Sequence, residues 1–340
     1  MRLFVRFLIC FSFLLVMTWQ ALPSLYGSSY PRPLGPELNR HIRYNYQDKL
    51  IAEHDRVVLL GDSALFDSVD PAAFQQVIGL NNLSIAIPGS ASALWYLIFK
   101  NNIINSSFKP RVVVVFFCDT ELTTPDFRVA GKYLTILDEY AGLNDTLFVQ
   151  RAYIDPMSPF EKLFKMYVPL YGERIKLRQT QEYWIKYRIP ALLIRCDQTC
   201  TDSATKQVFN QGQTDQDELE NEVGAGEADL YAPRNLLFAY QLNRSFLPEM
   251  VRLAKESDIR LIMVRQKTLR FSSPLSEPPA LALYIQGLQS YLAQNGIPLV
   301  DFSNDARIKA SFFHDPVHMN KEGKTAFTQM AAEALLPLIK

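Results

Sequence analysis

The chain has 340 residues, of which 48% are hydrophobic and 21% are charged, enough apolar sequence for one large core or two smaller ones. This composition excludes a disordered or collagen-like chain. The 35 Lys and Arg residues balance 35 Asp and Glu residues, so no net charge draws the whole chain to nucleic acid or to anionic lipid. We therefore expect no nucleic-acid partner.

Residues 1–26 are predicted to form an N-terminal membrane anchor or signal segment. Arg2 and Arg6 stand before a long apolar run that begins at Phe7 and is close to the ~20 residues that span a bilayer. Because the positive charges precede the run, the N-terminus is expected in the cytoplasm and the rest of the chain on the extracytoplasmic side, facing the periplasm or the cell surface. Residues 19–24 match a cleavage site poorly, so we favour an uncleaved anchor over a cleaved signal segment.

Residues 27–39 are rich in Ser, Pro and Gly and predict a tether, and residues 40–340 predict an α/β domain. Short apolar runs predict strands at 56–60, 83–87, 111–118, 260–265 and 298–302. Helical patterns alternate with them at 71–78, 90–104, 234–257, 279–295 and 321–338. Strands joined by helical crossovers imply one doubly wound parallel sheet.

The stretch at about 124–231 interrupts this alternation, because it has aromatic and basic helical patterns and no clear strand. We expect a mostly helical insertion that forms a lid on the α/β domain. Within it, residues 215–229 are strongly acidic and glycine-containing, which predicts a solvent-facing loop or a disordered segment.

The four cysteines leave one question open. Cys10 lies in the predicted anchor, and Cys118 ends an apolar strand, where a buried thiol is expected. Cys196 and Cys200 are close enough for a local disulfide in an oxidising compartment. A zinc site there would need two more ligands, which the neighbouring sequence lacks, so no metal is expected.

A serine follows the first predicted strand, in the sequence Gly61-Asp62-Ser63. Open α/β sheets present their ligands at the carboxyl ends of the strands, so this position suits a nucleophile. The N–H groups that follow it in the chain would point towards an oxyanion. The alternative is that Asp62 and Ser63 only cap the next helix.

Two of the four histidines, His314 and His318, lie just before the last predicted helix. Asp315 precedes His318 by three residues, a spacing that lets its carboxylate accept a hydrogen bond from the imidazole and fix the tautomer. The alternative is that Asp315 caps the helix and His318 lies on the surface. His314 is expected either beside His318 in a cleft or in a packing role.

A serine after the first strand and Asp-x-x-His before the last helix together resemble the SGNH, or GDSL-like, hydrolase superfamily. The resemblance covers most of the chain from about residue 56, and Asn320 and Gly323 match the stretch that commonly follows the histidine. It implies a flavodoxin-like doubly wound sheet and a catalytic triad of Ser63, Asp315 and His318, with no metal and no cofactor.

The resemblance also implies an oxyanion site made by the backbone N–H groups of Ser63 and Gly89, the latter in a second matching block after the second strand. The third block departs from the family. Where Gly-x-Asn-Asp is usual, this chain reads Cys118-Asp119-Thr120. Thr120 is the candidate to replace the asparagine, whereas a carboxylate at Asp119 would oppose an oxyanion.

An SGNH-like domain behind one N-terminal anchor resembles the extracytoplasmic proteins of alginate O-acetylation and teichoic-acid D-alanylation, which work beside a multi-spanning membrane acyltransferase. The resemblance implies serine-dependent acyl transfer or ester hydrolysis on a cell-surface or exported glycan. The expected partners are an acylated glycan or another ester, such an acyltransferase, and the membrane. A lipid or lysophospholipid esterase remains an alternative, as does an inactive SGNH-fold protein that binds or assembles glycans.

Overall fold

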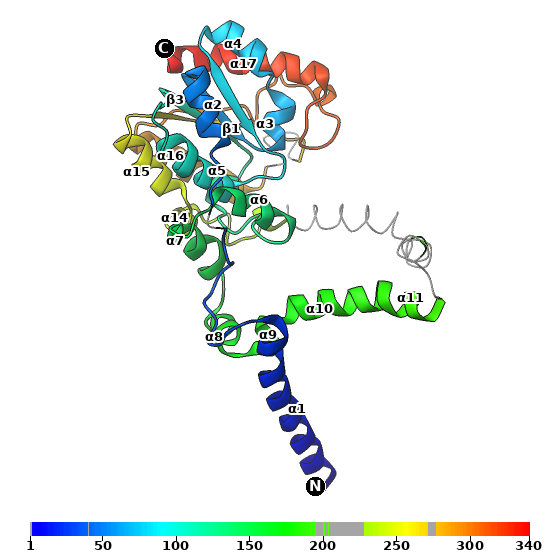
Figure 1. Ribbon diagram of the computed structural model, residues 1–340. Helices are drawn as coiled ribbons and strands as arrows, with labels where there is room; N and C mark the ends of the chain where they lie inside the picture. Colours follow the sequence, from blue (N-terminus) through cyan, green and yellow to red (C-terminus); the bar gives the residue numbers. More distant parts are fainter. Residues whose placement is uncertain (1, 40, 195–199, 201–202, 204–227, 271–276) are drawn as a thin grey trace. The chain divides into compact units, whose positions relative to one another are not determined.

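The computed structural model describes residues 2–39, 41–194, 200, 203, 228–270 and 277–340 (Figure 1). Contacts divide the chain into two compact units. Residues 37–153 and 226–340 form the first, which we call the sheet unit. Residues 1–36 and 154–225 form the second, which we call the anchor unit.

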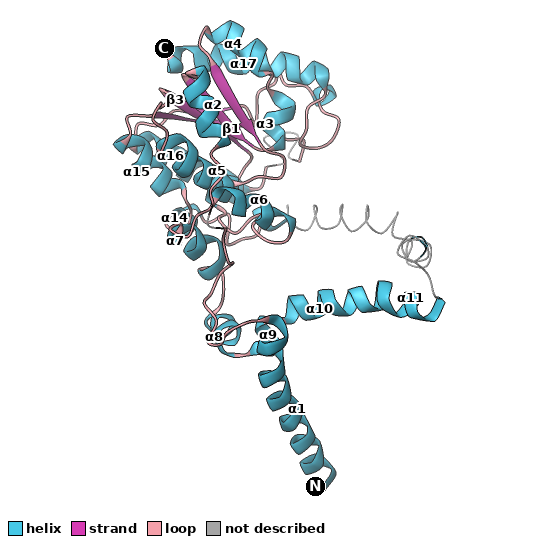
Figure 2. Ribbon diagram, viewed as in Figure 1, coloured by secondary structure: helices cyan, strands magenta, loops and turns pink. Residues whose placement is uncertain are grey.

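The sheet unit contains a five-stranded parallel sheet in the order β2-β1-β3-β4-β5. Figure 2 shows strands of this sheet, β1 and β3 among them, in magenta with helices around them. The strands are β1 (Val57–Gly61), β2 (Asn82–Ala86), β3 (Val112–Phe117), β4 (Arg260–Arg265) and β5 (Leu299–Asp301). This is the flavodoxin-like order, and the doubly wound α/β fold predicted from the sequence is confirmed. The chain turns to opposite sides of β1 to form β2 and β3, so the carboxyl edge between β1 and β3 is where a ligand site is expected.

Helices cover both faces of the sheet, and every residue of β1 and β3 is therefore buried. On one face, Leu59 and Val114 pack with α3 (Ser63–Ser68), α4 (Pro71–Ile78) and α17 (Lys321–Ile339). On the other face, Leu60 and Val115 pack with α2 (Asn45–Glu53), α5 (Ser92–Ile98), α15 (Leu247–Glu256) and α16 (Pro279–Gln294). Alternate residues of one strand therefore belong to two separate cores.

Two predicted helices are modified in the structure. The helix expected over 234–257 is broken into α14 (Phe238–Leu242) and α15, whose first turn contains Pro248. The helix expected over 90–104 is α5 followed by a π-helical stretch, η1 (Phe99–Ile104). Shorter elements complete the sheet unit: η2 (Glu121–Thr123), α6 (Lys132–Tyr140), α7 (Thr146–Val149), η3 (Gln150–Ile154), which ends at the unit boundary, and η5 (Ala310–Phe312).

The stretch at 124–231, where a helical insertion is predicted, is divided between the two units. Its first part, through α6 and α7, belongs to the sheet unit, where Leu137, Tyr140 and Phe148 are buried in the core. Its middle part belongs to the anchor unit, whose helices α8 and α10 bury no side chain. Among the described residues between 124 and 194 there is no strand, and most of the acidic stretch at 215–229 lies outside the described residues.

The anchor unit consists of α1 (Arg2–Tyr26), α8 (Pro159–Tyr167), α9 (Pro169–Gly172), α10 (Arg174–Tyr183), η4 (Trp184–Arg188) and α11 (Ile189–Ile194). Within α1, Phe4–Tyr26 is the one helical segment of the described chain that is long and apolar enough to cross a membrane, a test that a signal sequence also passes. Cys196 lies outside the described residues, so the disulfide with Cys200 stays a prediction.

The predicted tether at 27–39 is partly packed. Ser28 and Arg32 both donate hydrogen bonds to Glu173 Oε1, at 2.6 and 3.1 Å, and the Glu173 side chain is fully buried. A buried carboxylate needs such hydrogen-bond donors. The composition of residues 27–39 does not predict that two of these residues would supply them. The first residues after α1 are therefore fixed to the helices of the anchor unit.

Candidate active site

Ser63 is the first residue of α3 and follows β1 by two positions. Asp62 caps the helix, and its Oδ1 accepts a hydrogen bond from the Ala64 N–H at 2.9 Å. The capping interpretation therefore holds for Asp62. It leaves the Ser63 hydroxyl free of a capping role at the carboxyl edge of the sheet.

His318 lies in a short loop that ends at α17. The loop is closed by an antiparallel bridge between Phe313 and Met319 and by a hydrogen bond from the His314 N–H to the His318 carbonyl, at 3.0 Å. Asn320 then caps α17 by accepting from the Gly323 N–H at 3.0 Å. The residues after the histidine thus fix the position of the loop.

The structure brings the three predicted triad residues together, although Ser63 and His318 are 255 positions apart in the chain. His318 Nε2 is 2.8 Å from Ser63 Oγ, and His318 Nδ1 is 2.6 Å from Asp315 Oδ2. Because a carboxylate only accepts, Nδ1 carries the proton, and Nε2 accepts from the serine hydroxyl. This is the arrangement that a general base needs to activate a serine.

Asp315 is held in its ionised form. Burial alone would raise the pKa of its carboxyl group, but hydrogen bonds from the His318 ring and from the N–H groups of Val317 and His318 outweigh burial and lower the pKa. The ionised carboxylate orients the imidazole and stabilises the imidazolium that forms when it takes a proton.

Gly89 lies in the loop after β2, and this loop is fastened to the end of β1. The Gly61 carbonyl accepts from the Ile87 N–H and from the Ser90 hydroxyl, each at 3.1 Å. Gly89 has φ +76°, and a Cβ there would lie 2.9 Å from the Tyr133 ring. Only glycine combines that backbone conformation with that contact. The loop that carries the second oxyanion candidate is thus fixed beside the start of α3.

The assignment of Thr120 as the third oxyanion donor is corrected by the structure. Thr120 is fully buried, and its hydroxyl donates to the Leu230 carbonyl at 2.6 Å. A hydroxyl has one proton, so none is left for an oxyanion. The side chain fastens the residues around Leu230 to the end of β3.

The neighbouring Asp119 is likewise committed to a buried network. Its Oδ1 pairs with Arg265 at 2.8 Å, and its Oδ2 accepts from the Tyr231 hydroxyl at 2.6 Å. Arg265 also pairs with Glu277 at 3.1 Å. The charge of Asp119 is therefore balanced by an arginine, and the repulsion of an oxyanion expected from the sequence is reduced.

The ionisable side chains of Arg128 and Glu121 lie near Asp62, next to Ser63 in the chain, and no sequence motif predicted them there. Arg128 has a left-handed backbone with φ +54°, unusual for a residue other than glycine, and its Nη1 lies 3.9 Å from Asp62 Oδ2. Glu121 is buried, and its Oε2 accepts from the Cys118 N–H at 2.8 Å. Burial, followed by the nearby Asp62, raises the pKa of Glu121 well above its usual range.

Replacing Glu121 by glutamine is expected to increase stability at neutral and alkaline pH. As pH rises above the usual Glu range, the unfolded chain releases the proton that folded Glu121 retains, so the wild type loses stability. Glutamine can keep the hydrogen bond from the Cys118 N–H and has no proton to release, so the stability of the variant should not fall over this pH range. Urea unfolding at pH 5 and pH 8 measures this, with exposed Glu322→Gln as control; an equal difference at both pH values would contradict it.

Gly323→Ala is expected to destabilise the loop of His318. A Cβ at Gly323 would collide with the Phe312 carbonyl oxygen, at the start of that loop. The backbone must shift, at a cost of about 1–3 kcal/mol. The Tm of thermal unfolding and the rate at which Ser63 reacts with an ester should both fall. Replacing the exposed Lys321 by alanine should leave both quantities unchanged. A variant as stable and reactive as wild type would show that the loop tolerates the shift.

His314, Asp315 and His318 also place potential metal-ligand atoms within 4.8 Å of one another. Asp315 Oδ2 and both ring nitrogens of His318 are already engaged in the hydrogen bonds that join Asp315, His318 and Ser63. A metal ion would compete with these hydrogen bonds. His314 is more than half exposed, and its ring stacks on that of His318 with centroids 5.8 Å apart.

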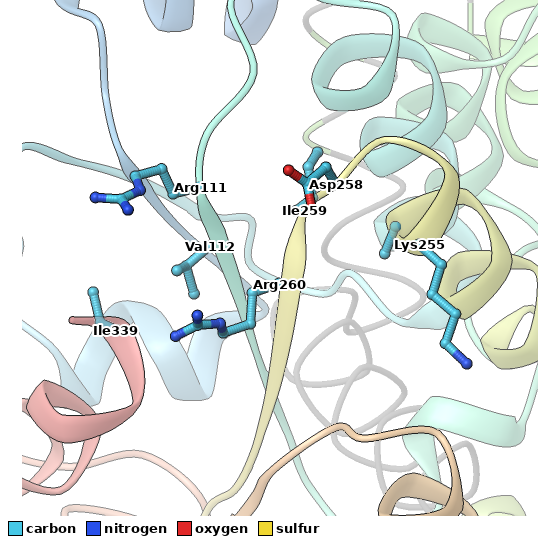
Figure 3. Close-up of a pocket in the computed structure, with 8 residues that line it drawn as sticks. Arg111, Val112, Lys255, Asp258, Ile259, Arg260 and Ile339 are labelled. Atoms are coloured by element: carbon cyan, nitrogen blue, oxygen red, sulfur yellow. The ribbon is translucent and has the colours of Figure 1, made fainter.

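A cavity of about 450 Å³ lies elsewhere on the sheet unit, at the amino ends of β3 and β4 (Figure 3). It is lined by Val112, Arg260 and the end of α17, among other residues. In a parallel sheet this edge is opposite the carboxyl ends where Ser63 lies. The cavity therefore takes no part in the chemistry of the triad.

No family model matches the chain, and no curated protein matches it. Solved structures similar to it include a Bacteroides fragilis protein assigned as an acylhydrolase, with 14% identity, TM-score 0.39 and coverage of 89% of this chain and 93% of the other. A GDSL-like lipase from Bacteroides thetaiotaomicron has 13% identity, TM-score 0.37 and coverage of 87% and 100%. An Agrobacterium tumefaciens protein assigned as an arylesterase has 10% identity, TM-score 0.32 and coverage of 82% and 97%.

Proposed function

We propose that the protein is a serine esterase or O-acyltransferase of the SGNH type. The observation that carries the proposal is the 2.8 Å contact between His318 Nε2 and Ser63 Oγ, with the imidazole oriented by Asp315. A nucleophile, a base and an orienting carboxylate in this order define nucleophilic acyl chemistry.

In the first half-reaction, Ser63 Oγ attacks the ester carbonyl carbon while its proton passes to His318 Nε2. The carbonyl electron pair moves onto oxygen, and the N–H groups of Ser63 and Gly89 stabilise the resulting oxyanion. The intermediate then expels the alcohol, which takes the proton from His318. The products are the free alcohol and an acyl ester on Ser63.

In the second half-reaction, a water molecule or another hydroxyl attacks the acyl carbon of the acyl-serine while His318 takes its proton. The bond between the acyl carbon and Ser63 Oγ then breaks, and His318 returns the proton to Oγ. Water gives a carboxylic acid and makes the protein an esterase, whereas a sugar hydroxyl gives a new ester and makes it a transferase. Access of water to the acyl-serine decides between the two outcomes.

The substrate we propose is an acylated cell-surface or exported glycan. Support comes from the apolar segment Phe4–Tyr26, which is long enough to span a membrane. Arg2 and Arg6 at its N-terminal end favour an extracytoplasmic position for the remaining chain. The resemblance to alginate and teichoic-acid acylation proteins supports a multi-spanning acyltransferase as partner. Two assays test this choice against the lipid esterase. Release or transfer of acetyl groups from an acetylated glycan would support the glycan substrate, whereas release of fatty acid from a lysophospholipid alone would support the lipid esterase.

The experiment that tests the catalytic proposal is covalent labelling of the full-length protein with a fluorophosphonate. Ser63 should be labelled, the label should disappear in Ser63→Ala, and it should be greatly weakened in His318→Ala. Ser84→Ala, a serine of β2 outside the site, is the matched control and should label normally. Absence of labelling in the folded wild-type protein would refute the proposal.

A non-catalytic glycan-binding protein of the same fold is the second candidate, favoured by one observation. The Thr120 hydroxyl is occupied by the Leu230 carbonyl, so the third oxyanion donor of the family is missing. Loss of one such donor costs about 10²- to 10³-fold in rate in a serine protease. Glycan binding that persists without any acylation of Ser63 would support this candidate.

A further inference from the structure

Helix α8 of the anchor unit has an exposed apolar face. Phe160, Leu163, Phe164 and Tyr167 recur at helical spacing, and their exposed fractions are 75%, 55%, 44% and 45%. Lys162 and Lys165 lie on the other side of the helix. Soluble proteins rarely leave such a contiguous aromatic surface in water, so this face is expected to have a partner.

The position of α8 is fixed relative to the end of α1. The Arg32 N–H, six residues beyond α1, donates to the Met166 carbonyl of α8 at 2.9 Å. Helix α9 contacts both α1 and α8. The apolar face of α8 is therefore held close to the residue where the membrane-spanning segment ends.

Helix α10 is fixed to the same point. Tyr26, the last residue of α1, shares a hydrogen bond between its hydroxyl and that of Thr180 at 3.3 Å, and Lys176 Nζ lies 5.8 Å from the centre of its ring. Helix α10 ends at Tyr183 and η4 begins at Trp184, and both side chains are exposed. The chain then continues into α11 (Figure 1). Amphipathic tyrosine and tryptophan side chains are typical of the membrane–water interface.

The charge of this segment complements anionic lipid. Residues 159–194 contain seven Lys and Arg residues and three Glu residues, a net charge of +4 in a chain that is neutral overall. Basic residues on one side of a helix and aromatic residues on the other are typical of helices that lie in the plane of a bilayer surface.

We propose that the apolar face of α8 lies in the headgroup region of the bilayer that α1 spans, on the side where α1 ends, and that anionic phospholipid is its partner. The inference rests on the membrane anchor in the proposed function. It adds a second attachment that does not depend on the catalytic site. Together the two attachments would fix the orientation of the anchor unit on the membrane, which one helix cannot do.

The test uses the full-length protein in nanodiscs of phosphatidylcholine and phosphatidylglycerol, with no other protein present. Phe164→Trp places a fluorophore on the apolar face, and Lys162→Trp is the matched control on the other side of the same helix. The native tryptophans are the same in both variants, so each added signal is obtained by difference. Lipids brominated in the upper acyl chain and aqueous iodide are the two quenchers.

We expect brominated lipid, and not iodide, to quench the signal added by Phe164→Trp, at a depth of about 5–10 Å into the headgroup boundary. The signal added by Lys162→Trp should show the reverse preference. Equal quenching of both by iodide would overturn the proposal and leave a protein as the partner of this face. Failure of the protein to remain on the nanodisc would refute the anchor, whereas fluorophosphonate labelling tests the catalytic proposal separately.

Discussion

Replacing Ser63 by alanine is expected to abolish ester turnover and covalent labelling, and His318→Ala should reduce both nearly as far. In a serine protease, loss of either group costs about 10⁶-fold in turnover, because neither works without the other. Because Ser63 and His318 are 2.8 Å apart, we expect them to depend on each other in the same way and either substitution to remove nearly all turnover. Turnover is measured with a chromogenic acetyl ester on the full-length protein, with the Ser84→Ala variant as control.

The double variant provides the sharper test. If Ser63 and His318 act as one unit, removing both should cost little more than removing one. Additive losses would show that His318 contributes by some route other than activating Ser63, and the assignment of the base would be wrong.

Asp315→Asn is expected to lower turnover by about 10⁴-fold while leaving the fold intact, as the equivalent change does in a serine protease. The ionised carboxylate accepts from His318 Nδ1 at 2.6 Å, and an amide oxygen supplies no charge to stabilise the imidazolium. An amide can also present its NH₂ group to the ring and favour the wrong tautomer. Turnover should fall without a matching change in KM.

Asp315 also supports the loop, because its Oδ1 accepts from the N–H groups of Val317 and His318. Asparagine keeps one oxygen for these bonds, so circular dichroism and thermal unfolding serve as controls for the fold. Turnover equal to wild type in a folded Asp315→Asn variant would show that another group orients His318.

The sheet was predictable because apolar runs in its strands are short, rich in Val and Leu, and buried on both faces. The termini of Val57–Gly61 and Val112–Phe117 differ from the expected ones by one residue at each end. The contact between Ser63 and His318 was predictable because the sequences around them resemble two blocks that a known superfamily combines.

Features that depend on distant partners could not be predicted. Thr120 has a hydroxyl group at the position expected for an oxyanion donor. The structure shows that this hydroxyl instead donates to the carbonyl of Leu230, 110 positions away in the chain. The division of the helical insertion could not be predicted either, because helices that pack on the sheet and helices that pack beside α1 have similar patterns. Arg128 lies close to Asp62 and has a left-handed backbone conformation that no local sequence motif predicts.

The separation of Ser63 from His318 along the chain has a consequence for biosynthesis. Synthesis proceeds from the N-terminus, so Ser63 emerges 255 residues before His318, and α17 emerges after His318. An unfinished chain would therefore hold an unactivated serine. In the function we propose, reactivity towards esters begins only when the loop of His318 is in place and α17 packs against α3 and α4.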